Sequence, residues 1–101
     1  MIVRAADRVL VQGITGTQGT FWSQQMIAYG TRIVGGVNPK KAGTEHLGLP
    51  VYESAIEALA HGGFEVAVMF VPPMAALAAA LDAIVAGARL LVVLTEHIPA
   101  Q

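Results

Sequence analysis

The 101-residue sequence predicts an α/β fold in which helices cover both faces of a parallel sheet. Short apolar runs that suit strands alternate along the chain with segments of helical spacing. Several of these runs are apolar throughout, which indicates strands that are buried on both faces. A glycine-rich turn follows the first run directly. Right-handed crossovers between such strands give a doubly wound, Rossmann-like sheet.

The first strand and the first helix flank that turn. Residues 9–11 form an apolar, β-branched run that stops at Gly13. Apolar and aromatic residues then recur at helical spacing, and Gly30 is placed as the residue that ends this helix. The side chains expected to pack one helix face onto the sheet are Trp22, Met26 and Tyr29.

The middle of the chain predicts a second strand and a loop. Residues 32–37 form the strand, and the two glycines inside it suggest close approach by another backbone or a ligand. Residues 38–50 have a loop-like composition, with two prolines and two glycines. Residues 51–52 predict a brief third strand.

The remaining elements complete the alternation. Ser54 and Glu57 match a capping box, in which each side chain accepts a hydrogen bond from the other residue's backbone N–H. The helix that they open is followed by an uninterrupted apolar strand over residues 66–71. An alanine-rich helix over residues 73–86 is expected to pack tightly. Residues 90–94 predict the last strand.

Composition restricts the class of protein. Net charge is −1, so no basic surplus exists to neutralise a nucleic-acid backbone. The absence of cysteine excludes disulfides and a thiolate nucleophile. Mean hydropathy is +0.60, yet each charge-free run is broken by glycine or proline, so we expect no membrane span. We expect one domain over residues 1–101, located in the cytoplasm, with part of its apolar content forming an interface.

The turn from Gly13 to Gly19 is the strongest candidate for a binding site. Its glycines let backbone N–H groups approach an anion, and the following helix start adds its positive dipole end. The GxxGxxG spacing differs from the dinucleotide fingerprint GxGxxG, and no Lys-Ser/Thr pair follows as in a P-loop. A phosphate or pyrophosphate suits this turn, and the alternative is a tight strand–helix connection without a ligand.

Two further segments are expected to meet the turn at the carboxyl edge of the sheet. Residues 38–41 follow the second strand and hold lysines where NAD sites place a carboxylate. This favours a ligand with an additional ribose phosphate, either NADP or coenzyme A, whereas the alternative is a solvated basic loop. Residues 94–96 close the last strand.

The segment from Gly13 to Phe21 (GITGTQGTF) closely resembles the CoA-binding loop of the succinyl-CoA synthetase (succinate–CoA ligase) α-subunit family. The likeness continues in order through residues 28–31, 34–37, 46–51, 71–72 and 95–99. It therefore spans essentially the whole chain. Lys40 and His97 depart from the family, since both stand where glycine is usual.

The resemblance implies a CoA-binding domain. Its family forms acyl-CoA from a carboxylic acid, CoA and a nucleoside triphosphate, through an acyl phosphate and a phosphohistidine. That histidine lies in a second α-subunit domain, so this chain alone is expected to be catalytically incomplete and to work with that domain and a β subunit. The resemblance implies these CoA-binding residues: Thr15, Gly16, Thr17, Gln18, Lys41, Leu94, Thr95 and Glu96.

Other readings of the same residues remain open. A free-standing module that senses CoA or another nucleotide would show the same binding without catalysis, and an NADP-binding oxidoreductase fragment would prefer NADPH. We expect no catalytic residue in this chain and no metal site, and we expect His46, His61 and His97 to be structural or solvated.

Overall fold

The apolar runs assemble into one six-stranded sheet. The computed structural model describes residues 7–71 and 73–93. The strand order is β3-β4-β2-β1-β5-β6; β3 is antiparallel to β4, and the other pairs are parallel. Chain order among the parallel strands changes direction at β1, which confirms the doubly wound, Rossmann-like fold. The strands are β1 (Arg8–Gln12), β2 (Arg32–Val37), β3 (Glu45–His46), β4 (Leu49–Tyr52), β5 (Val66–Met69) and β6 (Leu90–Val93).

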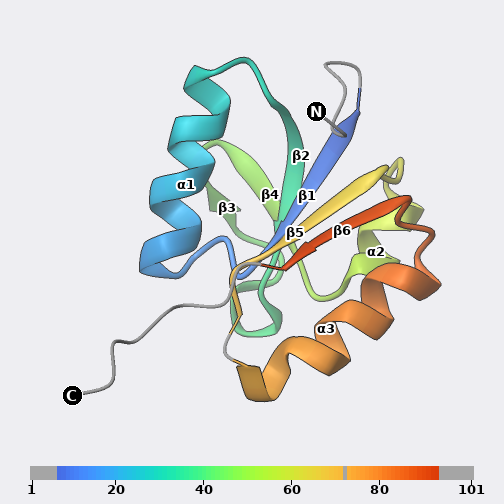
Figure 1. Ribbon diagram of the computed structural model, residues 1–101. Coiled ribbons are helices and arrows are strands. Elements are labelled where there is room, and N and C mark those ends of the chain that lie inside the picture. The colour runs from blue at the N-terminus through green and yellow to red at the C-terminus, as the bar shows by residue number, and fades with distance from the viewer. Residues whose placement is uncertain (1–6, 72, 94–101) are drawn as a thin grey trace.

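Helices cover both faces of this sheet. Figure 1 shows α1 on one side and α2 with α3 on the other. The helices are α1 (Thr17–Ala28), α2 (Ala55–Ala60) and α3 (Pro73–Val85), with a short 3₁₀ turn, η1 (Pro39–Lys41), after β2. Gly30 ends α1 with φ +94°, as the sequence predicts.

The core has two layers because successive strand residues point to opposite faces. Leu10 and Ala67 face α2 and α3, where small residues of both helices, among them Ala58 and Ala83, allow close packing. The residues of the other layer share the α1 side: Val9, Val11, Ile14, Ile33, Val51, Val66 and Val68.

The segment predicted as a loop contains a hairpin. β3 pairs with β4 through a two-residue turn, Leu47 and Gly48, whose φ values are +56° and +76°. Two positive φ values are typical of the hairpin turn whose twist matches the strands, although Asn-Gly is its usual sequence. The strand predicted over residues 51–52 is therefore longer, because β4 begins directly after the turn, at Leu49.

The packing predicted for α1 is wrong at two of three positions. Tyr29 is 94% exposed and Trp22 is 46% exposed, whereas Met26 is half-buried against the sheet. Gly19 and Ser23 are the buried residues of this helix. Small residues on the inner face bring α1 close to the sheet, so the aromatic side chains lie outside.

The capping box of α2 forms with a shifted partner. The Ser54 hydroxyl accepts from the Glu57 N–H at 3.1 Å, as predicted. The Glu57 carboxylate accepts from the N–H of Glu53 at 2.8 Å, one residue before the predicted donor. Asp82 of α3 adds a further acceptor, for the N–H of Ala55 at 2.6 Å.

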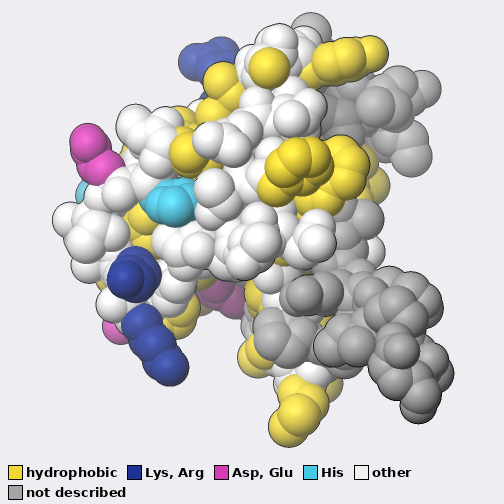
Figure 2. Space-filling view, turned by 90° about the vertical axis from the view of Figure 1, so that its left-hand side faces the viewer, with side chains coloured by type: hydrophobic (Ala, Val, Ile, Leu, Met, Phe, Trp, Pro, Cys, Tyr) yellow, Lys and Arg dark blue, Asp and Glu magenta, His cyan; other side chains and the backbone are white. Residues whose placement is uncertain are grey.

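Apolar side chains also lie on the surface. The prediction that α3 packs tightly is wrong for its outer face, where Met74 is 98% exposed and Leu77 is 71% exposed. Figure 2 shows hydrophobic side chains gathered on the α1 side, where Phe21 and Trp22 stack edge to face. No helix in the described part of the chain is long and apolar enough to cross a membrane.

Candidate functional site

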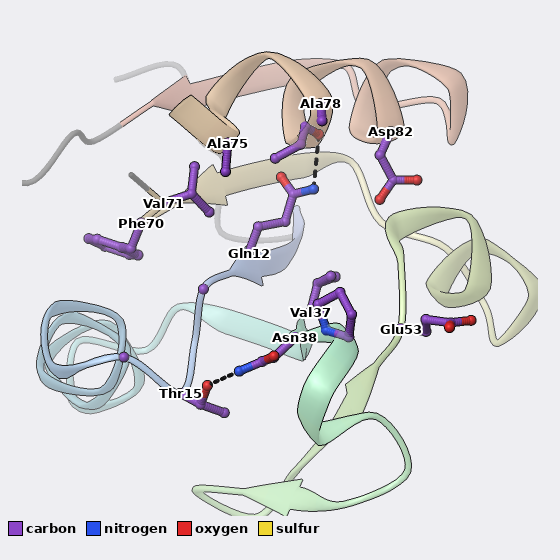
Figure 3. A pocket seen from close by; sticks show the side chains of 14 residues that line it. Gln12, Thr15, Val37, Asn38, Glu53, Phe70, Val71, Ala75, Ala78 and Asp82 are labelled. Carbon is purple, nitrogen blue, oxygen red and sulfur yellow. Dashed lines mark hydrogen bonds between the residues drawn. The ribbon is translucent and has the colours of Figure 1, made fainter. Parts of the chain in front are cut away.

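The carboxyl ends of β1, β2 and β5 open into a pocket of about 470 Å³. This is the point at which the strand order reverses, where doubly wound sheets bind ligands. Figure 3 shows the lining side chains converging from these strand ends and from α3. The lining residues are Gln12, Gly13, Thr15, Gly16, Val37, Asn38, Pro39, Glu53, Phe70, Val71, Ala75, Ala78, Ala79 and Asp82.

Packing explains two of the three turn glycines. A Cβ at Gly13, whose φ is +84°, would lie 2.1 Å from the carbonyl oxygen of Phe70. A Cβ at Gly19 would lie 2.1 Å from the carbonyl oxygen of Gly13. At Gly16 the nearest atom would be 3.5 Å away and φ is −73°, so neither packing nor backbone conformation requires glycine there. Gly16 lines the pocket and is exposed, which leaves room for a ligand against its backbone.

The start of α1 is open toward a ligand. Gly16 is the N-cap and supplies no side-chain acceptor, and the first turn of the helix holds no acidic residue. The first-turn N–H groups of a helix have no intrahelical partner. They carry the positive end of the helix dipole. The arrangement can therefore accept a phosphate oxygen.

A hydrogen bond joins this turn to the end of β2. Asn38 donates through Nδ2 to the Thr15 hydroxyl and accepts through Oδ1 from the Lys40 N–H at 3.0 Å. Because the Thr15 oxygen is an acceptor in this bond, its own hydrogen stays available for a ligand. The bond also fixes η1 beside the glycine-rich turn.

The structure brings together only part of the predicted site. Thr15 and Gly16 line the pocket. Thr17 and Gln18 lie in the exposed first turn of α1, and Gln18 accepts a hydrogen bond from the Trp22 indole at 3.0 Å. Lys41 is exposed at the end of η1, outside the lining. Leu94, Thr95 and Glu96 lie outside the described residues.

Sequence reasoning missed the far walls of the pocket. The alanines of α3 form an apolar wall, and Glu53 and Asp82 place carboxylates at one end. Gln12 was also missed, although a polar residue that closes an otherwise apolar strand is a visible signal. Identifying the α3 wall requires knowing that this helix packs on β5 and β6 beside the end of β1, which only the fold shows.

Two titratable groups with shifted pKa values, Arg8 and Glu65, lie at the amino edge of the sheet, opposite the pocket. The Arg8 guanidinium lowers the pKa of Glu65 to about 2, mainly through side-chain hydrogen bonds, and Glu65 in turn raises the pKa of Arg8. The Glu65 carboxylate also accepts from the Arg8 N–H at 2.7 Å. This pair joins the amino ends of β1 and β5, far from the pocket, so it is structural.

Two histidines have structural contacts. His46 Nε2 lies 2.8 Å from the Thr20 hydroxyl, which also donates to the carbonyl of Ile14 and so ties β3 to the turn. His61 stacks on Tyr52 with ring centroids 5.2 Å apart. Within residues 7–71 and 73–93, no group of three or more metal-ligating side chains gathers.

Comparison with known proteins identifies one family. Residues 5–97 match the family model described as "CoA binding domain". A succinate–CoA ligase α subunit of Archaeoglobus fulgidus is 48% identical over 99 residues, and a malate–CoA ligase α subunit of Methylorubrum extorquens is 46% identical over 93 residues. The alignments cover 98% and 92% of this chain but 34% and 31% of those proteins, so the chain spans about a third of the length of these curated relatives.

Solved structures agree on the fold. A conserved hypothetical protein from Pyrococcus furiosus superposes with a TM-score of 0.72 at 26% identity, over 87% of this chain and 74% of that one. A Rex-family repressor gives the same TM-score at 14% identity, over 90% of this chain and 53% of that one, and shows the fold alone.

Proposed function

The chain belongs to the CoA-binding domain family, and on that basis we propose that the pocket beside Gly16 binds coenzyme A. We further propose that the chain is the CoA-binding part of an acid–CoA ligase α subunit. The complete ligase would join a carboxylic acid to CoA at the expense of a nucleoside triphosphate, through an acyl phosphate and a phosphohistidine outside this chain.

Gly16 is the observation that carries the proposal. It is the turn glycine that packing does not require, it lines the pocket, and it begins a helix whose first N–H groups are open. A diphosphate seated there would accept hydrogen bonds from the backbone and from the Thr15 hydroxyl. Thr17 and Gln18, in the same first turn, would contact its outer oxygens.

Lys41 is proposed to contact the 3′-phosphate of CoA. It is exposed at the end of η1, the turn that Asn38 holds beside the pocket. No carboxylate lies at residues 38–41 to repel that phosphate. Leu94, Thr95 and Glu96, which follow β6 in the sequence, remain proposed contacts by resemblance.

The acid substrate is proposed to be bound outside this domain. Relatives that match this chain carry the names of succinate–, malate– and sulfoacetate–CoA ligases. One kind of domain thus accompanies different acids, which suits a part that binds their common substrate, CoA. The exposed apolar face of α3 supports docking to a companion domain or a β subunit, in a cytoplasmic assembly.

Calorimetric titration of the protein with CoA, dephospho-CoA and NADPH tests these assignments. We expect CoA to bind more tightly than dephospho-CoA or NADPH. The affinity for CoA should fall as salt is added. Loss of one phosphate contact should weaken binding about tenfold. Lys41→Ala should therefore weaken the binding of CoA but not the binding of dephospho-CoA.

Lys40→Ala is the matched control, because both lysines are exposed in the same turn. Equal affinity for CoA and dephospho-CoA, with no effect of salt, would remove the role of Lys41. Tighter binding of NADPH than of CoA would overturn the proposed ligand.

A further inference from the structure

Gln12 is a buried polar side chain with an unused acceptor. It is the last residue of β1, is 2% exposed and lines the pocket. Its Nε2 donates to the backbone carbonyl of Ala79 in α3 at 3.0 Å. Its Oε1 has no hydrogen-bond partner among the residues that the structure describes. Buried side-chain polar atoms are normally paired, so this oxygen requires an explanation.

The orientation of the amide is fixed by its surroundings. If the amide were reversed, Oε1 would face the Ala79 carbonyl oxygen, and two acceptors would meet. The amide nitrogen must therefore point to α3. Figure 3 shows the side chain between the strand end and α3, in a pocket that Val71 and Ala75 also line. These neighbours carry apolar side chains, which offer Oε1 no donor.

We infer that Gln12 Oε1 accepts a hydrogen bond from an N–H or O–H group of the bound ligand. The inference rests on the proposed binding of CoA and adds a contact to it. The Thr15 hydroxyl and the first-turn N–H groups of α1 offer hydrogens to an anion, whereas Gln12 offers an acceptor in the same pocket. CoA carries neutral donors on both sides of its diphosphate, in the adenine amine and in the pantetheine arm.

The contact would also couple ligand binding to α3. The Gln12 amide would join the ligand through Oε1 and α3 through Nε2, so that one side chain aligns the apolar wall with the ligand. Hydrogen bonds in such a chain strengthen one another in a site of low dielectric. Gln12 is therefore assigned as a specificity residue of the CoA site.

The Gln12→Met variant tests this assignment by calorimetry. Methionine has a similar length and lacks both the acceptor and the donor. We expect CoA to bind about tenfold more weakly, the effect of one lost hydrogen bond in a desolvated site. Ser23→Ala is the matched control, since it removes the Ser23 hydroxyl, which is also buried without a partner among the described residues and lies outside the pocket lining. Its affinity for CoA should equal that of the unmodified protein.

Two ligands locate the donor. If the donor is the adenine amine, a CoA analogue with hypoxanthine in place of adenine should bind weakly to the unmodified protein. The Gln12→Met substitution should then lower the affinity for this analogue only slightly further. If it lies in the pantetheine arm, adenosine 3′,5′-bisphosphate should bind both proteins equally.

The side-chain ¹⁵N signal of Gln12 gives a readout in the unmodified protein, and we expect it to shift when CoA is added. Unchanged CoA affinity in a folded Gln12→Met variant, or an unmoved Gln12 signal at saturating CoA, would overturn this inference alone. Absence of CoA binding to the unmodified protein would instead overturn the proposed function.

Discussion

Glycine residues near the pocket differ in what they do. Gly13 lets the end of β1 pass beneath the carbonyl of Phe70, and Gly36 makes room for Ile14, whose Cγ2 would lie 2.2 Å from an added Cβ. At Gly16 an added Cβ would make only an ordinary contact, 3.5 Å from the Gly13 carbonyl oxygen. The sequence shows all three glycines and predicts the turn, but it does not separate those that pack from the one beside which a ligand fits. That distinction depends on Phe70 and Ile14, which are far from their glycine partners in sequence.

Gly13→Ala should therefore destabilise the protein more than Gly30→Ala. Both glycines have positive φ, which costs an alanine about 1–2 kcal/mol. An added Cβ at Gly30 would have no atom of the described residues within 4 Å, whereas an added Cβ at Gly13 would also clash with the Phe70 carbonyl. We expect a loss of about 1 kcal/mol at Gly30 and of at least about 3 kcal/mol at Gly13, measured by urea unfolding. Equal losses would contradict this account of the turn.

At the scale of elements, the three helices end in the same way. Gly30, Gly62 and Gly87 follow the final turns with positive φ, and each accompanies the two backward hydrogen bonds of a Schellman motif. This signal is local, so the sequence predicts the end of α1 at Gly30. The hairpin turn at Leu47 and Gly48 was missed because its first residue is an uncommon choice for positive φ.

Helix α2 depends on a residue from another helix. It has six residues, too few to be stable alone, and Asp82 of α3 accepts the N–H of Ala55 at its start. Asp82→Ala should cost about 1.5–3 kcal/mol in urea unfolding, since the bond has a charged acceptor and is half-buried.

The local cap provides the comparison. Ser54→Ala should cost about 1 kcal/mol, and Asp82→Asn should cost less than Asp82→Ala because an acceptor oxygen remains. If Asp82→Ala costs no more than Ser54→Ala, the link between the two helices does not stabilise the fold.

At the scale of the whole molecule, the two edges of the sheet have different chemistry. The carboxyl edge holds the pocket, and the amino edge holds the pair of Arg8 and Glu65. The sequence predicts the parallel sheet that separates these edges, because several of its strands are apolar throughout. It does not predict the ion pair, which joins residues far apart in sequence, nor the exposed face of α3, whose alanine and leucine content also suits burial.

The amino edge should make global stability depend on acid. The pKa of Glu65 is lowered to about 2 in the folded protein, so the folded state binds fewer protons than the unfolded chain. The pair stabilises the folded protein fully above the ordinary glutamate pKa of about 4.3. This contribution is lost as pH falls through about 2. Thermal unfolding between pH 6 and 2 should show the advantage of the unmodified protein over Glu65→Gln shrinking across this window. If the stabilities of the two proteins changed in parallel with pH, the pair of Arg8 and Glu65 would not be the cause of the acid dependence.

Binding of the CoA diphosphate at Gly16 is the central claim, and a pair of variants tests it most directly. Gly16→Asp and Gly16→Asn both supply a favoured N-cap for α1, so both should keep the stability of the unmodified protein. Only aspartate adds a negative charge at the proposed phosphate site. Calorimetric titration with CoA at low ionic strength should show Gly16→Asp binding at least about tenfold more weakly than Gly16→Asn. Equal affinities in the two folded variants would contradict the claim and place the diphosphate elsewhere.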